Sequence, residues 1–203
     1  MAKLAATRGN LVKLKHSLKM AQSGHELLDQ KRQVLMKELV RFIDSAKEIQ
    51  SEIETTFRDA YRALEKANIS IGIDTVEDIS ESVPLTNDIT VRLHSIMGVE
   101  IPDVDPIDTK TVPSYSFHGS TGAMDAVYVQ FKKVMSLVAR LAEVETSVYR
   151  LAIQIRKTHR RVNALEKIVI PSNKADIRFI SDVLEEGERD DFIRMKLAQE
   201  KLG

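Results

Sequence analysis

The chain has 203 residues with no cysteine, no tryptophan, 30% charged residues and a formal net charge of zero. The absence of cysteine excludes disulfide and thiolate chemistry and favours a reducing compartment. The balanced charge favours neither a nucleic acid nor a membrane surface as a partner, and the 5% aromatic content is low for a compact core but usual for long helices.

Charge is distributed unevenly along the chain. Residues 1–40 hold eight Lys or Arg against three acidic residues, whereas residues 70–121 hold two basic residues against nine acidic ones. The start of the chain lacks the apolar stretch of a signal peptide, and no window approaches the run of about 20 apolar residues that crosses a bilayer. We therefore expect a soluble cytoplasmic protein with mildly basic ends and an acidic centre, peripheral to a membrane only through its partners.

Residues 1–69 are predicted to form a long N-terminal helix. Good helix formers dominate there, no proline occurs before Pro84, and Thr7 or Asn10 can cap the start. Two sets of apolar residues recur every seven positions. The apolar stripe that they form on the helix is too narrow to cover a globular core and is typical of a two-helix seam. The first set contains Leu4, Leu11, Leu18, Leu39, Ala46, Ile53, Ala60 and Ala67, and the second contains Leu14, Ala21, Leu28, Leu35, Phe42, Ile49 and Ala63.

Residues 70–121 are predicted to be a small irregular insert that is not helical. The segment holds four of the five prolines. Val91 and Leu93 alternate with polar residues, and Met97-Gly98 is followed by a second apolar run, so we expect a short β-hairpin that turns near Gly98.

Residues 122–203 are predicted to form a second long helix with a kink or short break near Pro171, which lacks a backbone donor. Its seven heptad positions are Val127, Val134, Leu141, Val148, Ile155, Val162 and Val169. The predicted fold is therefore all-α: the N- and C-terminal helices form a long antiparallel coiled coil, with the insert between them. The second helix is longer, so its C-terminal end should extend beyond the pair.

Two polar residues, His25 and Arg32, interrupt the first seam. If residues 69 and 122 lie at the same end of the pair, His25 faces the vicinity of Glu166, and Arg32 faces His159. Buried polar seam residues can fix the pairing register of a coiled coil, so these four residues are predicted to form a polar layer. The alternative is that the two side chains extend from the seam into solvent.

Several strings of this sequence resemble the D subunit of the V-type and archaeal-type rotary ATPases. The strings are TRGNL (7–11), LLDQKRQVL (27–35), IMGVEIPDVD (96–105), KTHRRVNALEKIVIP (157–171) and VLEEGERDDFIRMK (183–196). The resemblance covers both predicted helices nearly end to end and is weaker between residues 68 and 95. The string at 157–171 is the most specific, because no generic heptad implies it.

The resemblance implies a non-catalytic central rotor shaft. In that family the paired helices rise into a hexamer of catalytic and regulatory nucleotide-binding subunits, and the middle of the chain lies near the central-stalk F subunit and the socket subunit on the membrane ring. The candidate contacts with the catalytic ring are basic: Lys13, Lys15, Lys19, Arg160 and Arg161. For any single lysine among them, a solvated helix face is the alternative.

No catalytic, metal or cofactor site is expected. The sequence has no GxxxxGK[ST] loop, and its five histidines lack metal-binding spacing. Two other interpretations of the helices remain open. The basic first 40 residues suit a nucleic-acid-binding arm, although acidic residues interrupt them. A self-associating scaffold would use apolar residues off the main seam, namely Leu27, Val34, Met36, Val40 and Ile43.

Overall fold

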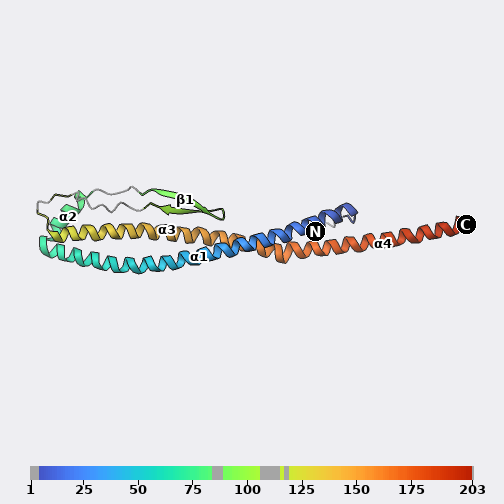
Figure 1. The fold of residues 1–203 in the computed structure, drawn as a ribbon, viewed down its shortest axis with the longest axis horizontal. Helices are drawn as coiled ribbons and strands as arrows, with labels where there is room; N and C mark the ends of the chain where they lie inside the picture. Colours follow the sequence, from blue (N-terminus) through green and yellow to red (C-terminus); the bar gives the residue numbers. More distant parts are fainter. Residues whose placement is uncertain (1–4, 84–88, 106–114, 117–118, 203) are drawn as a thin grey trace. The chain divides into compact units, whose positions relative to one another are not determined.

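The computed structural model describes residues 5–83, 89–105, 115–116 and 119–202, and the chain divides into two compact units. Unit 1 contains residues 1–34 and 155–203, and unit 2 contains residues 35–154. The prediction of long N- and C-terminal helices with a central antiparallel hairpin is confirmed (Figure 1). The elements are α1 (Arg8–Ile71), α2 (Ile73–Ser82), β1 (Val91–Ile96), β2 (Val99–Val104), α3 (Gly122–Ala164), the π-helical turn η1 (Leu165–Val169) and α4 (Ile170–Leu202).

Helix α1 begins and ends where its sequence provides the signals. The Thr7 hydroxyl accepts a hydrogen bond from the backbone N–H of Asn10 at 3.3 Å, so Thr7 is the N-cap, as predicted. Gly72 ends the helix with a φ of 87°, a conformation that glycine adopts without steric cost. The described seam residues of α1 are all buried or half-buried, and Leu4 lies outside the described residues.

The insert begins with a helix, α2, which corrects the prediction that this segment is not helical. Val76 and Ile79 lie three residues apart on one face of α2 and pack into a cluster with Ala67 of α1 and Val127 of α3. This short amphipathic face stabilises a helix that propensity alone would leave marginal.

The predicted hairpin is present and turns at Met97 and Gly98. Strands β1 and β2 pair antiparallel, with Val91 opposite Val104 and Ile96 opposite Val99. Both turn residues have positive φ, 51° for Met97 and 76° for Gly98, as a two-residue type I′ turn requires. Gly98 suits that conformation, whereas Met97 adopts it at some steric cost.

The core of unit 2 lies where α1, α2 and α3 meet. Tyr115 is 6% exposed there, and its hydroxyl donates a hydrogen bond to Asp125 in the first turn of α3. Burial, and next the hydrogen bond to Asp125, raise the pKa of the Tyr115 phenol above its ordinary range. Further along α3 the seam includes Leu137, Val144 and Leu151, together with Ser147, whose buried hydroxyl donates to the carbonyl of Glu143 at 2.7 Å.

In unit 1 the seam changes register at the π-helical turn. Val162 is buried, but Val169, the next position of the predicted heptad, is 36% exposed. The prediction that Val169 lies in the seam is therefore wrong. A π turn adds one residue to a helix, so the covered face continues one position later. These later positions are Ile170, Asn173, Ile177, Ile180 and Leu184, all buried or half-buried.

The expected break near Pro171 takes the form of this π turn, and the chain remains helical through Pro171. The N–H of Ile170 bonds to the carbonyl of Leu165, five residues earlier. A proline inside a regular α-helix clashes with the carbonyl four residues before it. A wider turn directly before Pro171 relieves that clash without ending the helix.

Candidate functional site

A polar layer in unit 1 joins α1 to α3. The Nη1 atom of Arg32 lies 3.1 Å from Nδ1 of His159, and its Nη2 atom lies 2.6 Å from a carboxylate oxygen of Asp29. Gln33 donates to the other oxygen of Asp29 at 3.0 Å, and the amide of Asn163 lies 3.1 Å from Nε2 of His159. The layer is thus a continuous chain of five side chains.

The chemistry of Arg32 assigns the hydrogen positions in this layer. A guanidinium only donates hydrogen bonds, so Nδ1 of His159 must accept, and the imidazole proton lies on Nε2. That proton points at Asn163, which can accept it only through its side-chain carbonyl oxygen. The Asn163 amide therefore presents Oδ1, and not Nδ2, to the imidazole.

Of the four residues predicted to form the layer, the structure brings Arg32 and His159 together. His25 is half-buried and Glu166 is exposed, and the described part of the chain has no hydrogen bond or ion pair between them. Glu166 belongs to the π turn, which displaces it from the register that a regular helix would give. Sequence reasoning missed Asp29, Gln33 and Asn163, although each lies three or four positions from its partner on the same helix, the spacing at which side chains meet.

The five predicted basic contact residues all lie on exposed surface of unit 1. Lys13, Lys15 and Lys19 are on α1, and Arg160 and Arg161 are on α3. Within the described residues, none of the five forms an ion pair, so their charges are available to a partner.

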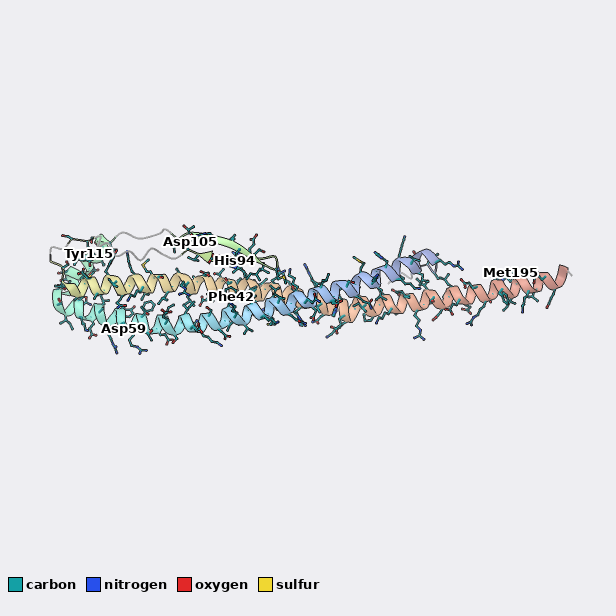
Figure 2. All side chains as sticks on the ribbon, viewed as in Figure 1. Phe42, Asp59, His94, Asp105, Tyr115 and Met195 are labelled. Carbon is teal, nitrogen blue, oxygen red and sulfur yellow. The ribbon has the colours of Figure 1, made fainter. Side chains whose placement is uncertain are left out.

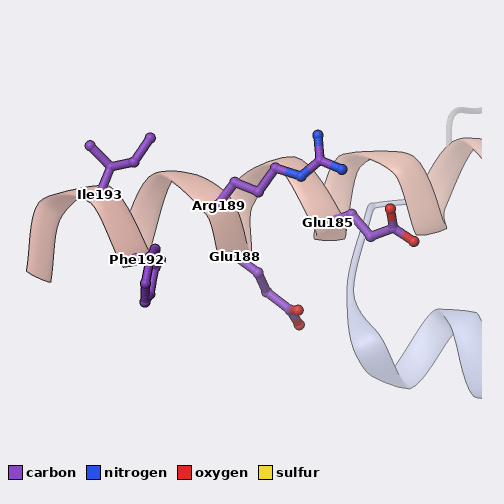
Figure 3. Close-up of a pocket in the computed structure, with 5 residues that line it drawn as sticks. All are labelled: Glu185, Glu188, Arg189, Phe192 and Ile193. Carbon is purple, nitrogen blue, oxygen red and sulfur yellow. The ribbon is translucent and has the colours of Figure 1, made fainter. Parts of the chain in front are cut away.

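The C-terminal part of α4 extends past its last polar contact with α1. Nδ2 of Asn173 donates to the hydroxyl oxygen of Ser17 at 3.4 Å. Arg8 forms an exposed ion pair with Glu188 at 2.5 Å. Beyond Glu188, every residue to Glu200 is exposed. Figure 3 shows a shallow groove on this segment, lined by Glu185, Glu188, Arg189, Phe192 and Ile193.

Large apolar side chains are exposed on this end of α4. Phe192, Ile193, Met195 and Leu197 each expose more than half of their surface, and Figure 2 labels Met195. They form two pairs at helical spacing, Phe192 with Met195 and Ile193 with Leu197, and exposed apolar side chains of this kind mark sites of protein interaction.

Unit 2 carries an apolar groove of 520 Å³ between α1, α2 and α3. Apolar residues such as Leu64, Val76 and Phe131 line it, and Asn68 lies among them. The side-chain oxygen of Asn68 is buried and has no hydrogen-bond partner among the described residues. This groove can accept an apolar group that carries one hydrogen-bond donor.

The hairpin of unit 2 lies against α3, and Figure 2 labels His94 and Asp105 there. Glu143 of α3 accepts a hydrogen bond from the backbone N–H of Val104 at 3.1 Å. Arg150 of α3 donates to the backbone carbonyl of Glu100 at 3.0 Å. These two contacts orient the hairpin relative to the helix.

Among the described residues, no group of three or more His, Asp or Glu side chains is arranged to hold a metal ion. The helices of the described ranges also include none that is both long and apolar enough to cross a membrane.

The family model for the ATP synthase D subunit matches residues 10–200. The chain is 43% identical to the V-type ATP synthase D subunit of Thermotoga neapolitana over 199 residues, which cover 98% of each chain. It is 39% identical to the A-type ATP synthase D subunits of Pyrococcus abyssi and Pyrococcus furiosus, over 96% of this chain and 92% of each relative.

Proposed function

The chain belongs to the ATP synthase D subunit family, and we propose that it is the non-catalytic central rotor shaft of a V/A-type ATPase. In this role it couples ATP hydrolysis or synthesis in the catalytic hexamer to ion translocation through the membrane ring. The observation that carries the proposal is the end of α4, which extends past Glu188, the last residue with a polar contact to the described part of α1, and exposes apolar side chains.

A shaft needs to contact the surrounding subunits unequally. Similar nucleotide sites in a ring adopt different conformations only if the central subunit contacts each of them differently. An equilibrium between two conformations shifts only when a bound partner interacts more favourably with one of them. Two helices of unequal length supply such an asymmetric element. Its rotation exchanges the contacts among the surrounding subunits and thereby couples nucleotide state to rotor angle.

We assign the end of α4 to the interior of the nucleotide-binding hexamer. The apolar residues after Glu188 have no covering partner among the described residues, and exposure of that much apolar surface favours burial against another protein. We propose that the exposed cations of unit 1, Arg160 and Arg161 above all, contact acidic loops of the catalytic and regulatory subunits.

We assign unit 2 to the part of the complex near the membrane ring. Its partners in this proposal are the central-stalk F subunit and the socket subunit on the membrane ring. Its acidic insert and exposed apolar residues, among them Met36 and Val40, support an interaction role. The protein would then be peripheral to the membrane through the complex.

ATP turnover of the catalytic hexamer tests the proposal. The full chain should increase turnover, whereas a chain that ends at Glu188 keeps its contact with Arg8, loses the apolar end and should not increase it. A chain that ends at Leu197 is the matched control, because it retains Phe192, Ile193 and Met195. Unchanged turnover on addition of the full chain, or stoichiometric nucleotide binding by the isolated chain, would contradict the proposal.

Self-association is the other function that an observation favours, because Leu27 is 65% exposed on α1. Sedimentation of the chain alone and with the F subunit separates the two functions. A one-to-one complex with the F subunit supports the shaft, and a homodimer of the isolated chain supports a scaffold.

A further inference from the structure

The two edges of the hairpin differ in their protection. The N–H of Asp105 bonds to the carbonyl of Thr90 at 3.0 Å, so Thr90 and Asp105 are a hydrogen-bonded pair of the ladder. Such pairs recur at every second position of an antiparallel ladder. The backbone groups of Arg92, His94 and Ile96 therefore point inward to β2, and those of Val91, Leu93 and Ser95 point outward. On β2, the outward groups belong to Glu100, Pro102 and Val104.

The outer edge of β2 is closed. Arg150 donates to the carbonyl of Glu100, and Glu143 accepts from the N–H of Val104. Pro102, between them, has no N–H, so this position presents no donor to another strand. Helix α3 and one proline thus prevent another strand from pairing with β2.

The outer edge of β1 is open. Within the described part of the chain, the outward backbone groups of Val91, Leu93 and Ser95 form no hydrogen bond. The strand contains no proline or bulge, two of the devices with which proteins protect a free edge, and the charge of Arg92 is held in an ion pair with Asp105 of the same hairpin.

The side chains of β1 favour an added strand as well. Val91 is 53% exposed and Leu93 is 58% exposed, and the two project from the same face of the strand. A neighbouring strand with apolar residues at alternate positions would cover both side chains.

We propose that β1 accepts an extended strand from another subunit of the complex, which lengthens the hairpin into a three-stranded sheet. The backbone of Val91, Leu93 and Ser95 supplies the hydrogen bonds, and Val91 and Leu93 select for apolar residues on one face of the incoming strand. The inference rests on the proposed function, because that function supplies the other subunits.

Amide hydrogen exchange at single-residue resolution tests this, with the chain alone and in the complex reconstituted with its catalytic, regulatory, central-stalk F and socket subunits. Exchange at Val91, Leu93 and Ser95 should slow by about a hundredfold on assembly. The amides of Arg92 and His94 already bond within the hairpin and serve as internal controls. If the partner contacted only side chains of β1, exchange at Val91, Leu93 and Ser95 would not slow relative to exchange at Arg92 and His94.

Two variants at Leu93 separate backbone pairing from apolar contact. Leu93→Pro removes an outward donor while leaving the ladder to β2 intact, and it should weaken association with the other subunits at least about tenfold. Leu93→Ala keeps the donor and should weaken association no more than about threefold. Protection of Arg92 and His94 in each variant shows that the hairpin is folded, and the exchange experiment decides the question if Leu93→Pro unfolds it.

Three results would overturn the inference. One is a complex that assembles and increases ATP turnover while Val91, Leu93 and Ser95 exchange as fast as in the free chain; that result leaves the proposed function intact. Another is concentration-dependent protection in the free chain, which identifies a second copy as the occupant. Failure of the wild-type chain to associate with any of these subunits would remove the proposed function together with the inference.

Discussion

Arg32 of α1 and His159 of α3 face each other in unit 1, with Nη1 of the guanidinium 3.1 Å from Nδ1 of the imidazole. The side chain of Arg32 is 31% exposed, and exposed polar contacts contribute little free energy of unfolding. Their value in a coiled coil lies in selecting one register, because a shifted pairing would leave Arg32 opposite an apolar residue.

The first prediction is that Arg32→Leu reduces register specificity while changing the free energy of unfolding by less than about 1 kcal/mol. Since the chain has no cysteine, Ser17→Cys with Asn173→Cys gives a clean reporter of register. The reporter should form one intramolecular disulfide, and Arg32→Leu should lower its yield. Gln30→Leu, at an exposed position of the same helix, is the control. An unchanged yield in Arg32→Leu would show that the layer does not set the register.

The second prediction concerns the one-residue insertion at the π turn. Deletion of Lys167 together with Pro171→Ala should restore a regular helix in which Val162 and Ile170 become seven positions apart. The covered face is then preserved, so the cysteine pair at positions 17 and 173 should still form its disulfide. Deletion of Lys157, which lies in regular helix, rotates all later residues by about 100° and should abolish the disulfide. Loss of the disulfide in both variants would contradict the idea that the π turn acts as a one-residue insertion in the covered face.

The third prediction is that Leu151→Ala destabilises unit 2 by about 2–5 kcal/mol, because it opens a cavity at a completely buried position. Leu27→Ala removes the same atoms from a side chain that is 65% exposed, and it should change the free energy of unfolding by no more than about 0.5 kcal/mol. Denaturant unfolding followed by circular dichroism measures both. Equal losses in the two variants would contradict the assigned core.

The fourth prediction is a loss of stability at high pH that depends on Tyr115. Its pKa is raised in the folded state by burial, and then by the hydrogen bond to Asp125. Below the ordinary tyrosine pKa of about 10 the phenol is protonated in both states, so its contribution to stability is fully present. As pH rises further, only the unfolded chain releases the proton, and the free energy of unfolding falls.

Thermal unfolding at a series of pH values from neutral to strongly alkaline checks this prediction. Tyr115→Phe should show a weaker decline than the wild type above the ordinary tyrosine pKa of about 10, because it has no proton to release. Tyr149→Phe, at a position that is 67% exposed, is the control and should follow the wild-type curve. Identical curves for Tyr115→Phe and the wild type would contradict the assigned environment of the phenol.

The fifth prediction is that replacing both Arg160 and Arg161 with alanine weakens binding to the nucleotide-binding hexamer by roughly 0.5–2 kcal/mol. The loss should shrink as ionic strength increases, because exposed charges are screened. Replacing Arg156 and Lys157, two other exposed cations of α3, with alanine removes the same net charge and is the control. A loss that does not depend on salt would argue against an electrostatic role for the two arginines.

Much of the fold was predictable because heptad spacing and residue alternation are local signals. Apolar residues at every seventh position identified both long helices, and the alternation around Gly98 identified the hairpin. The strings near both ends of the chain also identified the family. Thr7 was recognisable as a cap because a helix start needs a side-chain acceptor at that position.

The remaining features depended on contacts between segments distant in the sequence. Helix α2 is stable because Val76 packs on Ala67 and Val127, and a ten-residue window shows none of those partners. The exposure of Val169 follows from the pitch of one turn, which a residue pattern does not specify. His159 meets Arg32 while Glu166 does not meet His25, because polar contacts require separations of about 3 Å and heptad spacing places residues only to within a helix face. Residue spacing was therefore enough to locate the covered faces of the long helices up to the π turn, because it is a local signal. The tertiary structure decided where the covered face shifts by one residue, which polar groups meet and which strand edge stays open.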